Sequence, residues 1–275
     1  EEDRQFVSVY GSGPTDVWAV GNGGLGYHYD GTEWTAYNAM PSTTENYLGV
    51  WGHYNRSGDE FWDAGFENPA EGGLGLDVRA WAIETYDNQI VAGGDFRNAG
   101  SDTANYVATF DGTSWTPLYN DSGPNNSIYD LTTYDGQLAV CGRFTNIDGQ
   151  DINSVAVWDG TQWNELGDGI VDEPEVSYEA RRVIEWNGDL VVVGAPQVTG
   201  LWDGSTWTQL DGFTGTLWAA TVYDGDLYAA GNTSAPGNGV LRLNGSTWEK
   251  VGNVEFSFWV YDMGVYDGDL YIGGD

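Results

Sequence analysis

A short motif returns five times along this chain and constrains the fold more than any other feature. Each copy has an aromatic residue or Leu, then Asp-Gly or Asn-Gly, two further residues and a Trp. Tight β-turns need a positive φ, which Gly and Asn tolerate. We therefore predict five β-hairpins, whose turn and Trp positions are Asp30 and Trp34, Asp111 and Trp115, Asp159 and Trp163, Asp203 and Trp207, and Asn244 and Trp248.

A second type of hairpin alternates with the first. It consists of an apolar run, a polar turn and a second apolar run ending in Gly, as in residues 83–94 and 131–142. Its Val, Ile, Leu and aromatic residues fit a pleated surface, and its glycines allow backbones or rings to approach closely. One repeat is thus four antiparallel strands. Such sheets bury both faces by packing radially, with Trp residues between neighbours, which predicts an all-β β-propeller.

The spacing of the hairpins predicts the number of blades. First hairpins are expected near residues 6–21, 48–65, 80–94, 129–142, 180–194, 218–231 and 259–274. Second hairpins are expected near residues 25–37, 106–118, 155–166, 198–210 and 239–251. We predict seven blades, with six or eight as alternatives, and a last blade that is incomplete in this chain. Residues 1–275 are then one propeller domain, which we expect to belong to a longer protein.

These units resemble the kelch-type, galactose-oxidase-like repeats of the β-propeller class. The resemblance is carried by an apolar run ending in Gly-Gly, an aromatic residue and a Trp, in residues 93–115 and 142–163. Only four residues separate Phe110 from Trp115, whereas kelch units place these two positions farther apart. The chain is more similar to shortened variants from secreted and cell-surface proteins. The resemblance implies the fold and an extracellular location, but propellers host many unrelated activities.

Charge restricts the partners that the chain can bind. It has 42 acidic and nine basic residues, and its formal net charge is −33. Nucleic acids and anionic membranes require a basic footprint, so the composition argues against both as partners. The acidity fits a high-salt habitat, calcium-bearing water outside the cell, or the solubility of a secreted protein, and we favour a halophilic or marine extracellular origin. The lone Cys141 is expected to be a buried apolar residue.

The sequence offers few catalytic groups. Its two histidines, His28 and His53, are isolated, and with one Cys they form neither a zinc site nor a nucleophile–base pattern. A copper-radical oxidase of the propeller class would need several histidines with a Tyr and Cys pair, a set that is missing here. Carboxylates are abundant, which leaves a glycosidase pair open. We therefore expect a protein that is not an enzyme, with a glycosidase as the alternative.

Two groups of residues are candidates for ligand binding. Around Gly149, the side chains of Asn146, Asp148, Gln150 and Asp151 offer the hard oxygen ligands that calcium takes. The matching loop after Phe96 has Gly100 and Thr103 in place of two of these, which favours the alternative that they are turn-forming residues. Off-pattern rings such as Trp62 and Trp259 either belong to the core or line a face and stack on sugars.

We accordingly predict a non-enzymatic extracellular or cell-surface β-propeller that acts as an interaction or structural module. It would present loops to a protein or glycan partner, without inserting into a membrane. One alternative is a carbohydrate-binding or carbohydrate-active propeller, a lectin or a glycoside-cleaving enzyme, that depends on calcium. Another is a subunit of a surface layer or appendage. No cofactor is required, and calcium is the ligand that the residues indicate.

Overall fold

The computed structural model describes residues 6–13, 16–21, 25–29, 32–36, 76–170, 178–253, 256, 259–266 and 268–274, with the backbone alone for most of the part before residue 76. The chain divides into two compact units, residues 1–55 with 212–275 and residues 56–211, which are described separately. Asp30, His53, Trp62 and the hairpin predicted near residues 48–65 lie outside the described residues.

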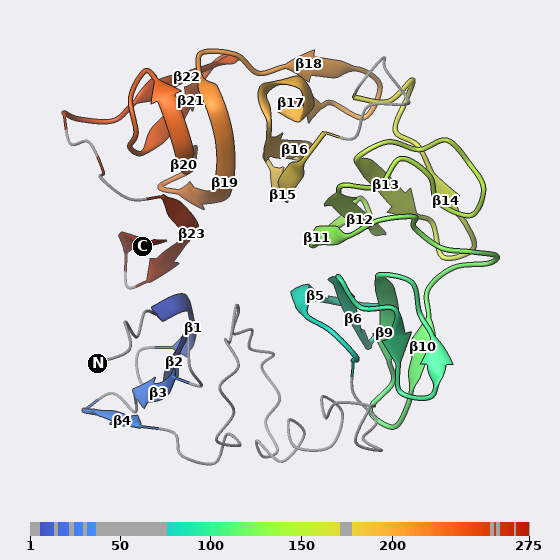
Figure 1. Cartoon of the computed structure of the whole chain (residues 1–275). Helices are drawn as coiled ribbons and strands as arrows, with labels where there is room; N and C mark the ends of the chain where they lie inside the picture. The colour runs from blue at the N-terminus through green and yellow to red at the C-terminus, as the bar shows by residue number, and fades with distance from the viewer. Residues whose placement is uncertain are drawn as a thin grey trace. The chain divides into compact units, whose positions relative to one another are not determined.

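The described residues of the unit 56–211 form three antiparallel sheets of four strands that follow one another along the chain (Figure 1). The first comprises β5 (Ala80–Tyr86), β6 (Gln89–Gly94), β9 (Val107–Phe110) and β10 (Trp115–Pro117). The second comprises β11 (Ile128–Tyr134), β12 (Gln137–Gly142), β13 (Val155–Trp158) and β14 (Trp163–Asn164). The third comprises β15 (Ala180–Trp186), β16 (Asp189–Gly194), β17 (Gly200–Trp202) and β18 (Trp207–Gln209). Between these strands lie the small pair β7 (Asn98–Ala99) and β8 (Asp102–Thr103), and the 3-10 helix η3 (Pro196–Val198).

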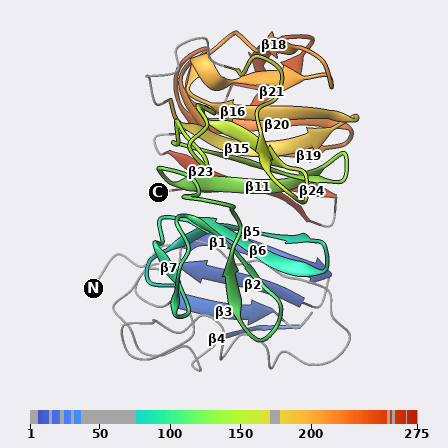
Figure 2. The same cartoon turned by 90° about the vertical axis from the view of Figure 1, so that its right-hand side faces the viewer.

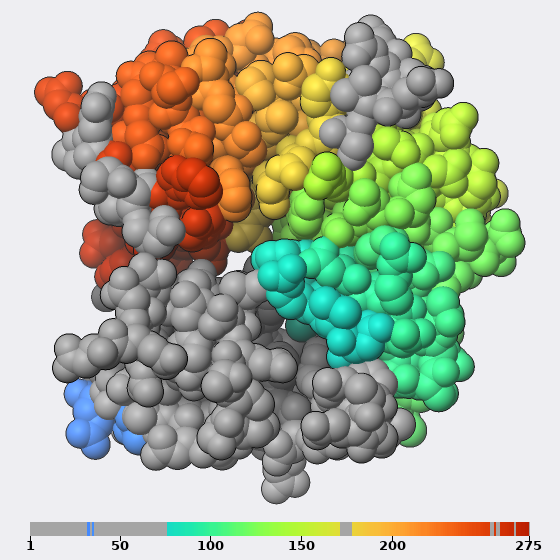
Figure 3. Space-filling view, in the orientation of Figure 1, coloured from blue at the N-terminus to red at the C-terminus, as the bar shows by residue number. Residues whose placement is uncertain are grey.

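The three sheets pack face to face in chain order. β11 contacts β5 on one side and β15 on the other, and these first strands lie one above another in Figure 2. The first two sheets, cyan and green in Figure 3, are in contact without interruption. One buried cluster joins Val91 to Trp158 and Trp163, and a second joins Val157 to Trp202. Each core therefore belongs to two neighbouring blades, which is the packing of a β-propeller.

A recurrent glycine closes the inner hairpin of each blade. A Cβ atom added to Gly142 at the end of β12 would lie 2.1 Å from the carbonyl oxygen of Ser127. The same approach recurs at Gly94 and Gly194, where the distance is again 2.1 Å. No side chain fits such a gap, so the repeated glycine of the sequence is required by the backbone.

The other unit contains two four-stranded sheets and one two-stranded sheet among the described residues. The four-stranded sheets are β1 (Phe6–Gly13), β2 (Asp16–Gly21), β3 (Leu25–Tyr29) and β4 (Trp34–Ala36), and β19 (Thr214–Tyr223), β20 (Asp226–Ala235), β21 (Leu241–Asn244) and β22 (Thr247–Lys250). The remaining pair is β23 (Val260–Tyr266) and β24 (Asp269–Gly274). β23 contacts both β19 and β1.

The prediction of an all-β propeller with four-stranded antiparallel blades is confirmed, whereas the number of blades stays a prediction. The predicted hairpins at residues 80–94 and 180–194 coincide with β5–β6 and β15–β16. The hairpin expected at residues 218–231 is longer and extends over residues 214–235. Its additional residues are largely polar or small, so hydrophobic periodicity could not reveal their pairing. None of the described residues forms a helix long and apolar enough to cross a membrane.

Candidate binding site

The first strand of each blade in residues 56–211 is interrupted near its start. The register of β5 on β6 shifts between Ala80 and Ala82, which leaves Trp81 without an opposite residue. The same shift leaves out Tyr129 in β11 and Arg181 in β15. A β-bulge bends the strand and re-aims the side chain of the extra residue, and bulges are enriched next to functional sites. Three equivalent backbone positions therefore carry three different, large side chains.

The three bulge side chains contact one another across the blades. The rings of Trp81 and Tyr129 meet edge to face, with centroids 6.1 Å apart and an interplanar angle of 81°. The guanidinium carbon of Arg181 lies 4.4 Å from the centroid of the Tyr129 ring. Edge-to-face rings and cation–π pairs are both favourable arrangements. The indole Nε1 of Trp81 is buried and donates to none of the residues that the structure describes.

A row of charged residues lies beside these side chains. The Arg79 Nη2 atom lies 2.9 Å from the Asp95 Oδ2 atom, and the guanidinium carbon of Arg79 lies 4.5 Å from the centroid of the Trp81 ring. The Ser127 hydroxyl, from the next blade, donates to Asp95 Oδ1 over 2.6 Å. This hydrogen bond joins the first two blades at their bulge end.

The row continues on the third blade. The Glu179 carboxylate accepts from Arg181 and lies 3.8 Å from the Arg143 guanidinium of the second blade. Roughly half of the Arg79 and Arg143 side chains is exposed, at 52% and 51%, so ligands can reach them. We call the set of Arg79, Trp81, Asp95, Tyr129, Arg143, Glu179 and Arg181 the bulge cluster.

The bulge cluster concentrates a residue type that this chain almost lacks. Three of the nine basic residues belong to it, and Arg182 follows directly in sequence. Arg182 approaches Asp130 of the neighbouring blade to 3.5 Å, with both side chains largely buried. Asp130 also accepts a hydrogen bond of 2.9 Å from the backbone N–H of Val183. The cluster thus offers guanidinium donors, carboxylate acceptors and aromatic faces in nearly balanced charge.

The predicted calcium loop makes protein contacts in this structure. The Asp148 carboxylate accepts hydrogen bonds from the four backbone N–H groups of residues 120–123, over 2.8–3.1 Å. Burial raises the pKa of Asp148, but these donors outweigh it and place the pKa below its ordinary value. Asp148 therefore pins the preceding inter-blade loop.

The other three predicted ligands are also engaged. Asn146 Oδ1 accepts from the N–H of Gly149 over 3.0 Å, and Asn146 Nδ2 donates to Asp151 over 3.2 Å. Gln150 Nε2 donates to the carbonyl of Trp163 over 3.4 Å. Among the described residues, no three His, Cys, Asp or Glu side chains gather in a metal-binding group. Calcium binding by Asn146, Asp148, Gln150 and Asp151 stays a prediction.

The repeated Asp residues of the second hairpins hold their own turns. Asp203 Oδ1 accepts from the Ser205 hydroxyl over 2.7 Å and from the backbone N–H groups of Ser205 and Thr206 over 2.8 Å each. The hydroxyl and these N–H donors lower the pKa of Asp203 to about 2. Asp159 is bound in the same way and its pKa is depressed further, first by the Thr161 hydroxyl. Asp111 accepts from two backbone N–H groups, and its pKa is also lowered.

Two of the repeated Trp residues, Trp163 and Trp207, bridge neighbouring blades. Trp163 is fully buried, and its Nε1 donates to the Leu118 carbonyl of the preceding blade over 3.0 Å. Trp207 makes the equivalent bond to Leu166 over 2.9 Å. Trp115 is buried in the core of its own blade, and Trp248, in the other unit, is 1% exposed. Trp34 begins β4 opposite Tyr29.

The fifth hairpin, which carries Asn244 in place of Asp, closes differently. Asn244 pairs directly with Thr247, so the strand ladder extends one residue pair closer to the turn than in the hairpin that pairs Trp158 with Trp163. Its side-chain amide donates to Glu249 over 3.1 Å instead of binding the turn. Both turn types place Gly at positive φ, as at Gly204 (90°) and Gly245 (63°). The Asp-Gly and Asn-Gly turns are therefore scaffold.

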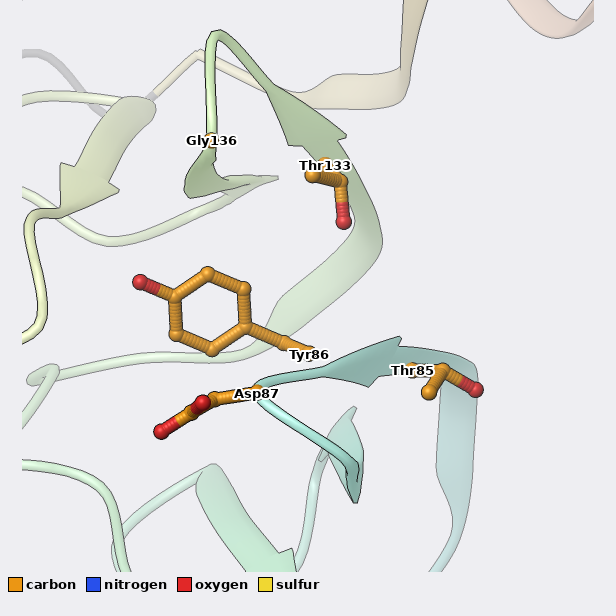
Figure 4. A pocket seen from close by; sticks show the side chains of 5 residues that line it. All are labelled: Thr85, Tyr86, Asp87, Thr133 and Gly136. Carbon is orange, nitrogen blue, oxygen red and sulfur yellow. The ribbon is translucent and has the colours of Figure 1, made fainter.

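A shallow hollow of about 430 Å³ lies at the opposite end of β5 and β11 from the bulge cluster. It is lined by Thr85, Tyr86, Asp87, Thr133 and Gly136 (Figure 4). The hydroxyl of Tyr86 and the carboxylate of Asp87 point to the same side in Figure 4, away from the two threonines. The side chains that line this hollow offer one carboxylate and three hydroxyls.

The bulge residues were not among the predicted site residues. The signal that could have found them is a comparison of equivalent positions in the described blades of residues 56–211, because Ala80, Ile128 and Ala180 are all apolar whereas the residues that follow them differ. In the other unit, the equivalent positions carry Trp218 and Tyr261, whose rings are 5.2 Å apart. Trp259, which the sequence marks as off-pattern, is 44% exposed and lies 5.8 Å from Trp218.

Comparisons with known proteins give the fold and no family. No family model and no curated protein matches the sequence. The extracellular domain of a protein described as the hybrid two-component system BT3049 of B. thetaiotaomicron superposes with a TM-score of 0.64 at 14% identity, over 98% of this chain and 38% of that one. The extracellular domain of BT4673, described as a one-component system of the same organism, gives 0.56 at 12% identity, over 100% and 38%. YCF48 from Cyanidioschyzon merolae gives 0.57 at 13% identity, over 99% and 93%. The chain thus spans less than two fifths of the two bacterial domains.

Proposed function

We propose that this chain is a non-enzymatic binding module that works outside the cell or at its surface, with the bulge cluster as its binding site. The observation that carries the proposal is the contact of Trp81, Tyr129 and Arg181 across three blades at equivalent bulge positions. The extracellular domains among its structural neighbours support the location. Conserved backbone geometry with variable side chains is typical of recognition surfaces built on a repeated scaffold.

The chemistry of the cluster suits polar recognition. The carboxylates of Asp95 and Glu179 each contact a guanidinium group, so acceptors and donors lie side by side. Both carboxylates can still accept further hydrogen bonds, because each oxygen has two lone pairs.

The charge of the chain indicates an uncharged ligand. A net charge of −33 repels anions at a distance, and the cluster itself nearly balances its guanidinium and carboxylate groups. Hydroxyl groups can accept from arginine and donate to carboxylates, while an apolar ring face packs on Trp81 and Tyr129. A neutral saccharide has both features, so we infer a neutral glycan as the ligand.

A glycan array tests this proposal. The wild-type chain and the Trp81→Ala/Tyr129→Ala double variant would be applied with calcium and with a chelator, in high salt. The proposal expects neutral glycans to bind the wild type and not the double variant. Tyr271→Ala, which removes a ring that is 53% exposed in the other unit, is the matched control and should keep binding. Equal binding by the double variant would refute the assignment of the site. Loss of binding with chelator would point to the Asn146–Asp151 loop.

A further inference from the structure

The Arg79–Asp95 pair of the bulge cluster is joined through both backbone and side chains. The backbone N–H of Asp95 donates to the Arg79 carbonyl over 2.9 Å, and Arg79 Nη2 donates to Asp95 Oδ2 over 2.9 Å. A Cβ atom added to Gly94, which precedes Asp95, would lie 2.1 Å from the same carbonyl oxygen, so the backbones are in close contact here. The backbone of one blade therefore fixes both residues.

Each side chain of the pair has a second neighbour that orients it. The Ser127 hydroxyl, from the next blade, donates to Asp95 Oδ1 over 2.6 Å. The guanidinium carbon of Arg79 lies 4.5 Å from the centroid of the Trp81 ring. Side chains that are already held in place lose little freedom when a ligand binds, which favours affinity.

The pair retains donors and acceptors for a ligand. The Arg79 side chain is 52% exposed and that of Asp95 is 23% exposed. A guanidinium has five N–H donors, and a carboxylate has about four lone-pair sites, of which Ser127 and Arg79 occupy two. A ligand can therefore accept from the guanidinium and donate to the carboxylate at adjacent positions.

Two adjacent hydroxyl groups on one sugar ring match this arrangement. A hydroxyl has one donor and two acceptor sites, so one of the two accepts from Arg79 while its neighbour donates to Asp95. Hydrogen bonds of this kind are strong, because each involves a charged group. A sugar that lacks one of the two hydroxyls leaves a charged group without its partner, and sites of this type reject such analogues.

We propose that Arg79 and Asp95 recognise a vicinal diol of the glycan and determine the specificity of the bulge cluster. This inference rests on the proposed function, because it takes a neutral glycan as the ligand. It adds that the sugar bound by this pair carries two free, adjacent hydroxyl groups. Glycans in which a substituent or a linkage blocks one hydroxyl of every such pair are then poor ligands.

Methylated glycans test this proposal. The probes are the neutral glycan with the strongest array signal and its derivatives in which single hydroxyl groups are O-methylated, and binding to the intact chain is measured by calorimetry. We expect methylation at either hydroxyl of one vicinal diol to weaken binding to the wild type at least about tenfold, because each removes a hydrogen bond to a charged group. Equal binding of all the derivatives would overturn the proposal.

Three variants locate the contact. Asp95→Asn keeps the shape of the side chain but loses the charged acceptor, and Arg79→Lys keeps the charge but loses the planar fork of donors. Both should weaken binding of the unmodified glycan at least about tenfold, and both should bind the two diol-methylated derivatives nearly as well as the unmodified glycan. Arg97→Ala is the matched control, because it removes a guanidinium that lies 4.3 Å from the centroid of the Tyr106 ring, outside the bulge cluster. It should bind like the wild type.

Melting temperatures establish that each variant is folded, and if Asp95→Asn does not fold, Arg79→Lys and the methylated glycans decide. Wild-type discrimination that persists in both variants would overturn the assignment to Arg79 and Asp95. Glycan binding that depends on Trp81 and Tyr129 but on neither member of the pair would leave the proposed function intact and refute this inference alone. No binding of any neutral glycan to the wild type would refute the proposed function, and this inference with it.

Discussion

The two ends of the strands in residues 56–211 differ in what they repeat. At the turn end, the same Asp returns at positions 111, 159 and 203, and each carboxylate is bound by its own turn. At the bulge end, the backbone returns with the same register shift, but its side chains are Trp81, Tyr129 and Arg181. The turn end therefore repeats the same side chain, whereas the bulge end repeats only the backbone geometry.

This difference separates scaffold from candidate site. The turn carboxylates accept through Oδ1 from backbone N–H groups of their own turns, so each is held by the scaffold that it closes. The bulge side chains instead contact residues of other blades and remain partly open to solvent. Repetition in the sequence therefore marks what the fold needs, and variation at equivalent positions marks what a ligand could use.

The largest expected effect on stability comes from a substitution in the packing between blades. Trp163→Ala should lower the free energy of unfolding by about 3–5 kcal/mol, because it leaves a cavity where a fully buried ring packs against the preceding blade. Chemical denaturation followed by tryptophan fluorescence would measure it. A loss below about 1 kcal/mol would contradict the role assigned to the repeated Trp.

The next expected effect comes from the close backbone approach at Gly142, beside the bulge of β11. Gly142→Ala should cost about 2–4 kcal/mol, since the new methyl group would lie 2.1 Å from the Ser127 carbonyl oxygen. Gly264→Ala is the control, because a Cβ there meets nothing within 4 Å. Its stability should stay within about 0.5 kcal/mol of the wild type. Similar losses for both variants in a denaturant titration would show that the close approach is not the cause.

A smaller effect concerns the turns and depends on pH. The pKa of Asp203 is about 2 in the folded chain, whereas the ordinary value of an aspartate is 3.8. Because the folded value is depressed, its contribution to stability is complete above pH 3.8 and is lost as the pH falls towards 2. Asp203→Asn should therefore lower the melting temperature at pH 6 and change it little at pH 2. An equal decrease at both values would exclude the ionised turn as the cause.

The smallest expected effect on stability is at the bulge cluster, where we expect binding to change while the fold does not. Arg143→Ala removes a half-exposed side chain that lies 3.8 Å from Glu179. Surface ion pairs of this kind contribute little, so stability should stay within about 0.5 kcal/mol of the wild type. Glycan binding should nevertheless weaken, as measured by calorimetry on a glycan selected from the array. Unchanged binding would show that the Arg143 side chain does not contribute to glycan binding.

The sequence predicted the hairpins, the Asp-Gly and Asn-Gly turns and the recurrent glycines, because each depends on local backbone chemistry. The bulge residues escaped, since a bulge interrupts the two-residue alternation on which strand prediction rests. Trp81 and Tyr129 then look like ordinary core aromatics. The buried contact of Arg182 with Asp130 was also out of reach, because it joins residues 52 apart in sequence on two blades.

A paired measurement on two multiple variants tests the separation of scaffold and site most directly. One variant carries Ala at Asp111, Asp159 and Asp203, and the other carries Ala at Trp81, Tyr129 and Arg143. Melting temperature and glycan binding would be measured for both and for the wild type. The turn variant should melt earlier and still bind while folded, whereas the bulge variant should stay folded at the assay temperature and lose binding. Loss of binding in the folded turn variant, with binding retained in the bulge variant, would contradict the account.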